Sequence, residues 1–92
     1  MKLRYKKRAL ADIEAIHKYI TDYDRQAANG VVSRIERSIE RLLVLPLSGR
    51  LGPVPGTRLL VVPGLPYIVL HRVGDETIDI VAVLHTARRR RS

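Results

Sequence analysis

The stretch TRLLVVPGLPYIVLHRV, residues 57–73, decides the fold because it sets two apolar runs on either side of a Pro-Gly-Leu-Pro turn. The runs Thr57–Val62 and Tyr67–Val73 have the length and the β-branched composition of strands. A Gly-Asp turn then leads into a third run of the same kind, Thr77–His85. Short turns favour antiparallel pairing, so the second half of the chain predicts a small, mainly antiparallel sheet.

The predicted strands are apolar on both faces. Regular alternation divides the middle strand into Tyr67, Val69, His71 and Val73 on one face and Ile68, Leu70 and Arg72 on the other. It divides the last strand into Ile78, Ile80, Ala82 and Leu84 on one face and Val81 and Val83 on the other. Strands of this kind are normally covered on both sides. A pair of helices covers only one side, so the other is a shallow second core or, as we expect, a dock for another chain.

Two predicted helices precede these strands and follow a short strand at Lys2–Lys6. From Ala9 the apolar residues recur at helical spacing, which puts Leu10, Ile13, Ile16 and Ile20 on one face. A second stripe begins after the capping residue Asp24 and ends before Pro46, and consists of Ala28, Val31, Val32, Ile35, Ile39, Leu42 and Leu43. With so short a connection, the helices should form an antiparallel hairpin. We therefore expect an α+β fold in the order β-α-α-β-β-β.

Outside these elements the sequence predicts loops and a tail. Glycines and prolines make residues 49–56 a constrained loop, and the arginine run at 88–92 should be mobile. With 92 residues, the chain has room for one domain, spanning residues 1–92.

The charge balance implies an acidic partner. The chain has 17 basic residues, 13 of them Arg, against 9 acidic ones, a formal net charge of +8. Such a surface attracts nucleic acid or an acidic protein. The longest uncharged stretch, Leu59–His71, is interrupted by prolines, so we expect no membrane span. Acidic residues stand where the apolar part of an export signal would lie, and a cytoplasmic location is therefore expected.

Most catalytic signatures are missing from the sequence. It contains no cysteine, no P-loop and no dinucleotide-binding glycine motif, and its three histidines lack metal-ligand spacing. We therefore expect neither a metal nor a cofactor. The acidic residues of the first helix, Asp12, Glu14 and Asp22, stand among basic neighbours and are typical of a solvated face.

One polar cluster remains near the strands, and it consists of Arg50, Arg58, His71, Arg72, His85 and Arg88. If the last two strands pair, His85 comes close to Tyr67. The cluster is either a site for phosphate or an acidic surface, with histidine as a proton carrier, or a ring of solubilising arginines.

Four stretches carry a resemblance to a known family: RALADIEAI at 8–16, GPVPGTR at 52–58, VVPGLPY at 61–67 and VLHTAR at 83–88. Along nearly its whole length the sequence resembles the RelE/ParE toxins of type II toxin–antitoxin (plasmid-stabilisation) modules. This resemblance implies a growth-inhibiting toxin in a hetero-oligomer with an acidic antitoxin, part of which is disordered when free. We expect the antitoxin on the uncovered sheet face, on Leu59, Val61, Val69, Val81 and Val83.

The family divides on mechanism. RelE-like members cut mRNA on the ribosome, and Arg58 and His85 match positions that some of these nucleases use. They commonly carry an Arg where this chain has Tyr67-Ile68, and an aromatic residue near the C-terminus that this chain lacks. ParE-like members poison DNA gyrase without being enzymes, and the Pro-Gly-Leu-Pro-Tyr segment is more similar to theirs. The resemblance therefore favours a gyrase inhibitor, with a ribosome-dependent endoribonuclease as the alternative.

A plain nucleic-acid-binding module is a third interpretation. It explains the charge but not the motifs, and four Tyr without Phe or Trp offer few stacking surfaces. The residues expected to contact the target are Arg50, Arg58, Tyr67, His71, Arg72, His85 and Arg88.

Overall fold

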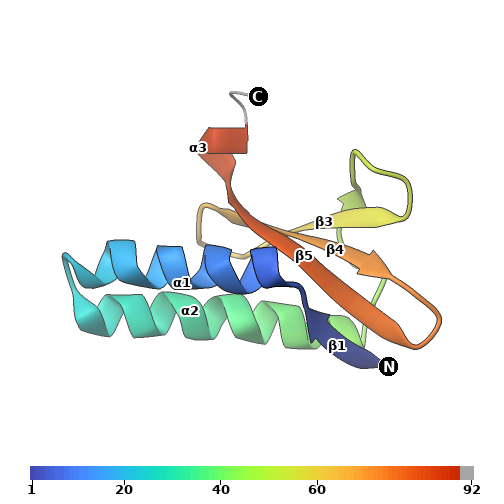
Figure 1. The fold of residues 1–92 in the computed structure, drawn as a ribbon, viewed down its shortest axis with the longest axis horizontal. Coiled ribbons are helices and arrows are strands. Elements are labelled where there is room, and N and C mark those ends of the chain that lie inside the picture. The colour runs from blue at the N-terminus through green and yellow to red at the C-terminus, as the bar shows by residue number, and fades with distance from the viewer. Residues whose placement is uncertain (90–92) are drawn as a thin grey trace.

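A computed structural model describes residues 1–89 and shows a helix hairpin against a five-stranded sheet (Figure 1). The two long helices lie side by side, and a short C-terminal helix continues from the last strand. The elements are β1 (Lys2–Tyr5), α1 (Lys7–Thr21), α2 (Arg25–Glu40), the 3-10 helix η1 (Arg41–Leu43), β2 (Arg50–Leu51), β3 (Thr57–Val61), β4 (Tyr67–Val73), β5 (Thr77–His85) and α3 (Thr86–Arg89).

The sheet has the strand order β1-β5-β4-β3-β2. β1 runs parallel to β5, and all other neighbouring pairs are antiparallel. The predicted α+β architecture with a mainly antiparallel sheet is confirmed. No helix in residues 1–89 combines the length and the apolar character needed to cross a membrane.

The core lies between the hairpin and one face of the sheet. Ile35 and Ile39 of α2 meet Val69, Ile78 and Ile80 of the central strands, and all five are fully buried. The predicted cap of α2 is also present, because the Asp24 carboxylate accepts a hydrogen bond from the Ala27 N–H at 3.1 Å.

A β-bulge corrects the predicted faces of the last strand. Leu70 pairs with Ala82, but the next residue of β4, His71, pairs with Ile80, so Val81 is an extra residue in β5. Beyond the bulge the alternation is inverted. Ile78, Ile80 and Val83 therefore belong to the same helix-side core, and Ala82 and Leu84 lie on the far face.

Three other local predictions also need correction. Leu10 is 54% exposed, because Ala9 is the residue of that helical turn that packs into the core. The constrained loop contains a two-residue edge strand, β2, which pairs with β3. Part of the predicted tail is helical, since α3 ends at Arg89, and residues 90–92 lie outside the described residues.

Candidate functional site

The polar residues singled out in the sequence fall at two separate ends of β4. The register places Tyr67 opposite His85 at one end, and His71 opposite Arg58 four residues further on. Four residues of extended strand span roughly 13 Å. The predicted cluster is therefore two groups of side chains rather than one site.

His71 belongs to the interior and not to a surface. Its side chain is fully buried, and its Nε2 donates to the Pro46 carbonyl at 3.3 Å. Burial lowers the pKa of the ring, and the neighbouring Arg58 charge acts in the same direction. The expectation that His71 contacts a target is therefore wrong, because a residue buried under the loop after η1 is out of a partner's reach.

The arginines of this group lie around the β2–β3 edge. Arg58 Nη1 donates to the Gly49 carbonyl at 3.3 Å, which ties its guanidinium to the loop before β2. Arg50 and Arg72 are exposed. Arg58 lies opposite His71, the residue next to Arg72 in β4. Successive residues of a strand point to opposite faces, so Arg58 and Arg72 lie on opposite faces of the sheet.

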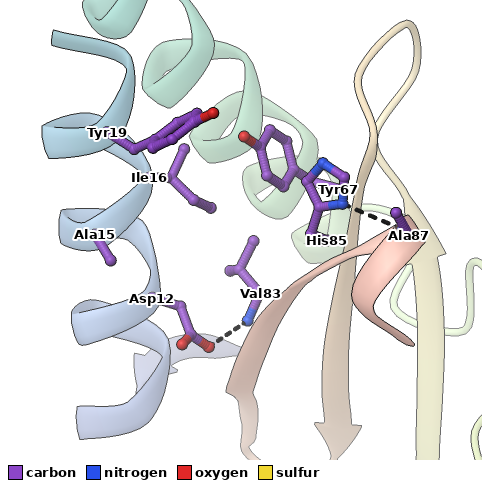
Figure 2. A pocket seen from close by; sticks show the side chains of 8 residues that line it. All are labelled: Asp12, Ala15, Ile16, Tyr19, Tyr67, Val83, His85 and Ala87. Atoms are coloured by element: carbon purple, nitrogen blue, oxygen red, sulfur yellow. Dashed lines mark hydrogen bonds between the residues drawn. The ribbon is translucent and has the colours of Figure 1, made fainter. Parts of the chain in front are cut away.

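Tyr67 and His85, the group at the other end of β4, line a cavity of about 380 Å³ between α1 and the end of β5 (Figure 2). Figure 2 shows the side chains of α1 on one wall and those of β4 and β5 on the other. The lining residues are Asp12, Ala15, Ile16, Tyr19, Tyr67, Val83, His85 and Ala87.

A hydrogen bond from the first turn of α3 holds the His85 ring in one orientation. Its Nδ1 accepts a hydrogen bond from the Ala87 N–H at 3.1 Å, so in the neutral ring the proton is on Nε2. The ring meets Tyr67 edge-on, with centroids 5.5 Å apart. The expected proximity of His85 and Tyr67 is confirmed. The backbone of Arg88 lies in α3, just beyond this pair.

Asp12 lines the cavity, whereas its sequence surroundings predict a solvated helix face. One of its oxygens, Oδ2, accepts a hydrogen bond from the Val83 N–H at 2.9 Å, and Oδ1 lies 3.3 Å from Arg8 Nε. β1 covers β5 only from Thr77 to Ile80, so the later N–H groups on that edge need another acceptor. The sequence carried a partial signal, since the predicted first strand is much shorter than the last.

The residues expected to meet an antitoxin do not share one face. Val69 and Val83 are in the helix-side core, and Val81 is the bulge residue. Leu59 is on the far face but only 2% exposed, whereas Val61 is 55% exposed. The predicted five-residue dock is therefore wrong as a single surface, because Leu59 and Val61 pair with Leu70 and Ile68, on the face away from Val69 and its partner Val83.

The cavity offers hydrogen-bonding groups and an apolar wall rather than a metal centre. Among residues 1–89 no three His, Cys, Asp or Glu side chains gather as a metal site would require. Asp12 accepts a hydrogen bond from the backbone of β5, and the other polar side chains of the lining are Tyr19, Tyr67 and His85.

Comparison with known proteins gives a consistent result. Residues 3–90 match the family described as the ParE toxin of the type II toxin–antitoxin system parDE. Over 84 residues the chain is 37% identical to Y4kP, a toxin candidate of Sinorhizobium fredii, covering 91% of this chain and 86% of the relative. Over 81 residues it is 37% identical to toxin RelE2 of Caulobacter vibrioides, covering 88% and 90%.

A solved structure shares the fold. A chain of the chromosomal ParDE toxin–antitoxin system from P. aeruginosa superposes with a TM-score of 0.83 at 27% identity. The match covers 92% of this chain and 95% of that one.

Proposed function

Because the chain belongs to the ParE family of toxins of type II toxin–antitoxin systems, we propose that it stops growth by inhibiting DNA gyrase. Family membership implies an antitoxin partner. The choice of gyrase over mRNA as the target is our inference from the arrangement of the polar residues.

The observation that carries this proposal is the separation of Arg58 and His85, the two residues that match nuclease positions. They lie on β3 and β5, with β4 between them, and their registers differ by four residues. Strand geometry then puts them roughly 13 Å apart along the strands and about 10 Å apart across them. RNA cleavage needs a base, an acid and a cation around one phosphate. This separation favours a binding role over catalysis.

Both side chains are also engaged within the protein. Arg58 donates to Gly49, and His85 accepts from the Ala87 N–H. We propose that target contact involves Arg50, Arg58, Tyr67, Arg72, His85 and Arg88, with His71 in a structural role.

The test compares the two targets directly. Purified toxin is added to a DNA supercoiling assay with gyrase, and transcripts are mapped after brief induction in cells. We expect loss of supercoiling or accumulation of cleaved DNA, with intact transcripts. Cuts at codons in the ribosomal A site, with normal gyrase activity, would contradict the proposal.

Two variants sharpen the comparison. In a nuclease, Arg58→Ala and His85→Ala should each raise the barrier by about 2.7–4 kcal/mol and abolish toxicity. For a gyrase inhibitor each removes one contact of a larger surface, so toxicity should fall only partly. Full loss with either variant, while the toxin remains folded by circular dichroism, would favour the nuclease.

A further inference from the structure

One edge of the second helix carries three arginines that take no part in the sites described above. Arg34 and Arg37 of α2 and Arg41 of η1 are exposed, and they line a cavity of about 310 Å³. Their spacing places them on one edge of the helix, and at about 1.5 Å per residue they span roughly 10 Å. We call these three residues the arginine row.

The charge of the arginine row is not neutralised within the described protein. Among residues 1–89, the side chains of Arg37 and Arg41 have neither a carboxylate nor another hydrogen-bond partner. Arg34 Nη2 donates to the Pro63 carbonyl at 2.7 Å, which fixes one guanidinium and leaves its remaining donors for a ligand. A guanidinium binds phosphate through two parallel N–H groups, so an unpaired row of them favours a ligand with several phosphates.

A buried hydroxyl lies among these arginines. Ser38 is only 8% exposed, and it lines both the arginine cavity and an adjoining cavity of about 110 Å³. Within the described residues its hydroxyl makes no hydrogen bond. Because a hydroxyl removed from water without a partner is unfavourable, a ligand oxygen at this place would stabilise the site. Phosphate oxygens accept hydrogen bonds from hydroxyl and guanidinium groups alike.

The opposite edge of α2 carries negative charge. There Glu36 and Glu40, with Glu14 of α1, line a separate cavity of about 690 Å³. The helix therefore separates positive from negative charge across its width. A polyanion is attracted to the arginine edge and repelled by the glutamate edge, so it would lie along the arginine row and not across the helix.

We propose that the arginine row binds the phosphate backbone of duplex DNA. One strand of a duplex carries one negative charge per about 3.4 Å of helix axis, so a row of roughly 10 Å meets about three successive phosphates. No aromatic side chain among the described residues lines either cavity, so an unpaired base finds no stacking surface and a duplex is favoured over a single strand. Contacts of this kind hold a protein on DNA without reading the base sequence.

The inference goes beyond gyrase inhibition and does not depend on it, because the toxin and DNA form the contact by themselves. Such a contact would keep the toxin beside the DNA on which gyrase acts.

The test measures binding of the purified toxin to a fluorescein-labelled duplex of about 20 base pairs and arbitrary sequence. Fluorescence anisotropy gives the affinity at several salt concentrations between about 50 and 200 mM. Two variants are compared with the unmodified toxin: Arg37→Ala/Arg41→Ala, called the arginine variant, and Ser38→Ala. Circular dichroism melting verifies that each variant folds.

The matched control is Lys18→Ala/Arg25→Ala, which removes the same amount of charge. Both residues are exposed. Arg25 precedes Arg34 by about two and a half helical turns, which puts it on the other side of α2.

We expect the arginine variant to bind about tenfold more weakly at low salt. Its plot of log affinity against log salt concentration should be shallower by roughly 2, for two lost phosphate contacts. Ser38→Ala should weaken binding about threefold and leave this slope unchanged, because the hydroxyl is uncharged. The control should stay within about twofold of the unmodified toxin.

Three results would overturn the proposal. An equal loss in the control would show that net charge, and not the arginine row, attracts DNA. An unchanged salt slope in the arginine variant would show that its arginines do not contact phosphates. Tighter binding of a single-stranded RNA of the same length would rule out duplex DNA as the preferred ligand.

A parallel supercoiling assay separates this proposal from the proposed function. If the arginine variant loses DNA affinity while no form of the toxin inhibits gyrase, the DNA site stands and the proposed function fails. If the unmodified toxin inhibits gyrase and the arginine variant keeps full DNA affinity, the DNA site is wrong and the proposed function stands.

Discussion

At the scale of single residues, His71 is a buried base with one of its two ring nitrogens hydrogen-bonded. Nε2 donates to Pro46, and Nδ1 has no hydrogen-bond partner among the described residues. Charging this ring in the interior is unfavourable, and burial accordingly lowers its pKa. His71 therefore couples the stability of the fold to pH.

The sign of that coupling is a prediction. The histidine pKa in the unfolded chain is about 6.5, and below that pH the unfolded chain binds a proton that His71 does not bind in the folded protein. The free energy of unfolding should therefore fall as the pH drops from 7.5 to 5.5. In His71→Leu, the drop in the free energy of unfolding between pH 7.5 and 5.5 should be smaller by on the order of 1 kcal/mol. Urea unfolding at both pH values measures this difference. Parallel curves for His71→Leu and the unmodified protein would contradict the assignment.

Gly64 is the second residue whose surroundings fix its identity. It has a φ of +76°, and a Cβ there would lie 2.7 Å from Arg34 Nη2. Gly64→Ala should cost about 1–2 kcal/mol, mostly from backbone strain, because the arginine tip can move aside. Gly30→Ala, in an open position on α2, should instead stabilise by roughly 0.5–1 kcal/mol. Thermal melting of both variants measures these changes. A lower melting temperature for Gly30→Ala as well as for Gly64→Ala would contradict the prediction.

At the scale of elements, the end of β5 depends on α1 for one of its hydrogen bonds. The short β1 leaves Val83 without a strand neighbour on that edge, and Asp12 supplies the acceptor. Asp12→Ala should therefore destabilise the protein by about 1–3 kcal/mol, through an unsatisfied N–H. Arg8→Ala removes only the exposed ion pair and should cost no more than about 1 kcal/mol. Equal effects of the two variants in urea unfolding would show that the ion pair, not the Val83 contact, matters.

At the scale of the whole molecule, a net charge of +8 and several exposed leucines and valines suit a protein that spends much of its time bound. Antitoxin that binds only the folded toxin stabilises it by mass action, by about 2.7 kcal/mol at a free concentration one hundred times the Kd. The melting temperature should therefore rise with antitoxin concentration in scanning calorimetry. A melting temperature independent of antitoxin would contradict this expectation.

The sequence alone determined the two long helices, the four longer strands and their order, but not the short elements η1, β2 and α3. Strand bounds for β4 and β5 follow from turns at Pro63–Pro66 and Gly74-Asp75, and the cap of α2 follows from Asp24. These features could be predicted because they depend on local propensities and on hydrophobic period. The family motifs, which also lie in continuous stretches, led to the toxin family in the same way.

Only the tertiary structure decided which side chains meet. The bulge at Val81 inverts the faces of β5, an event that regular alternation has no means of signalling. The β3–β4 register in turn splits the predicted antitoxin surface, since Leu59 and Val61 lie on the face away from Val69 and Val83. The burial of His71 and the Asp12–Val83 bond arise from segments distant in sequence. Side-chain partners of this kind depend on strand register and helix placement, which are set by packing of the whole core and not by any one segment.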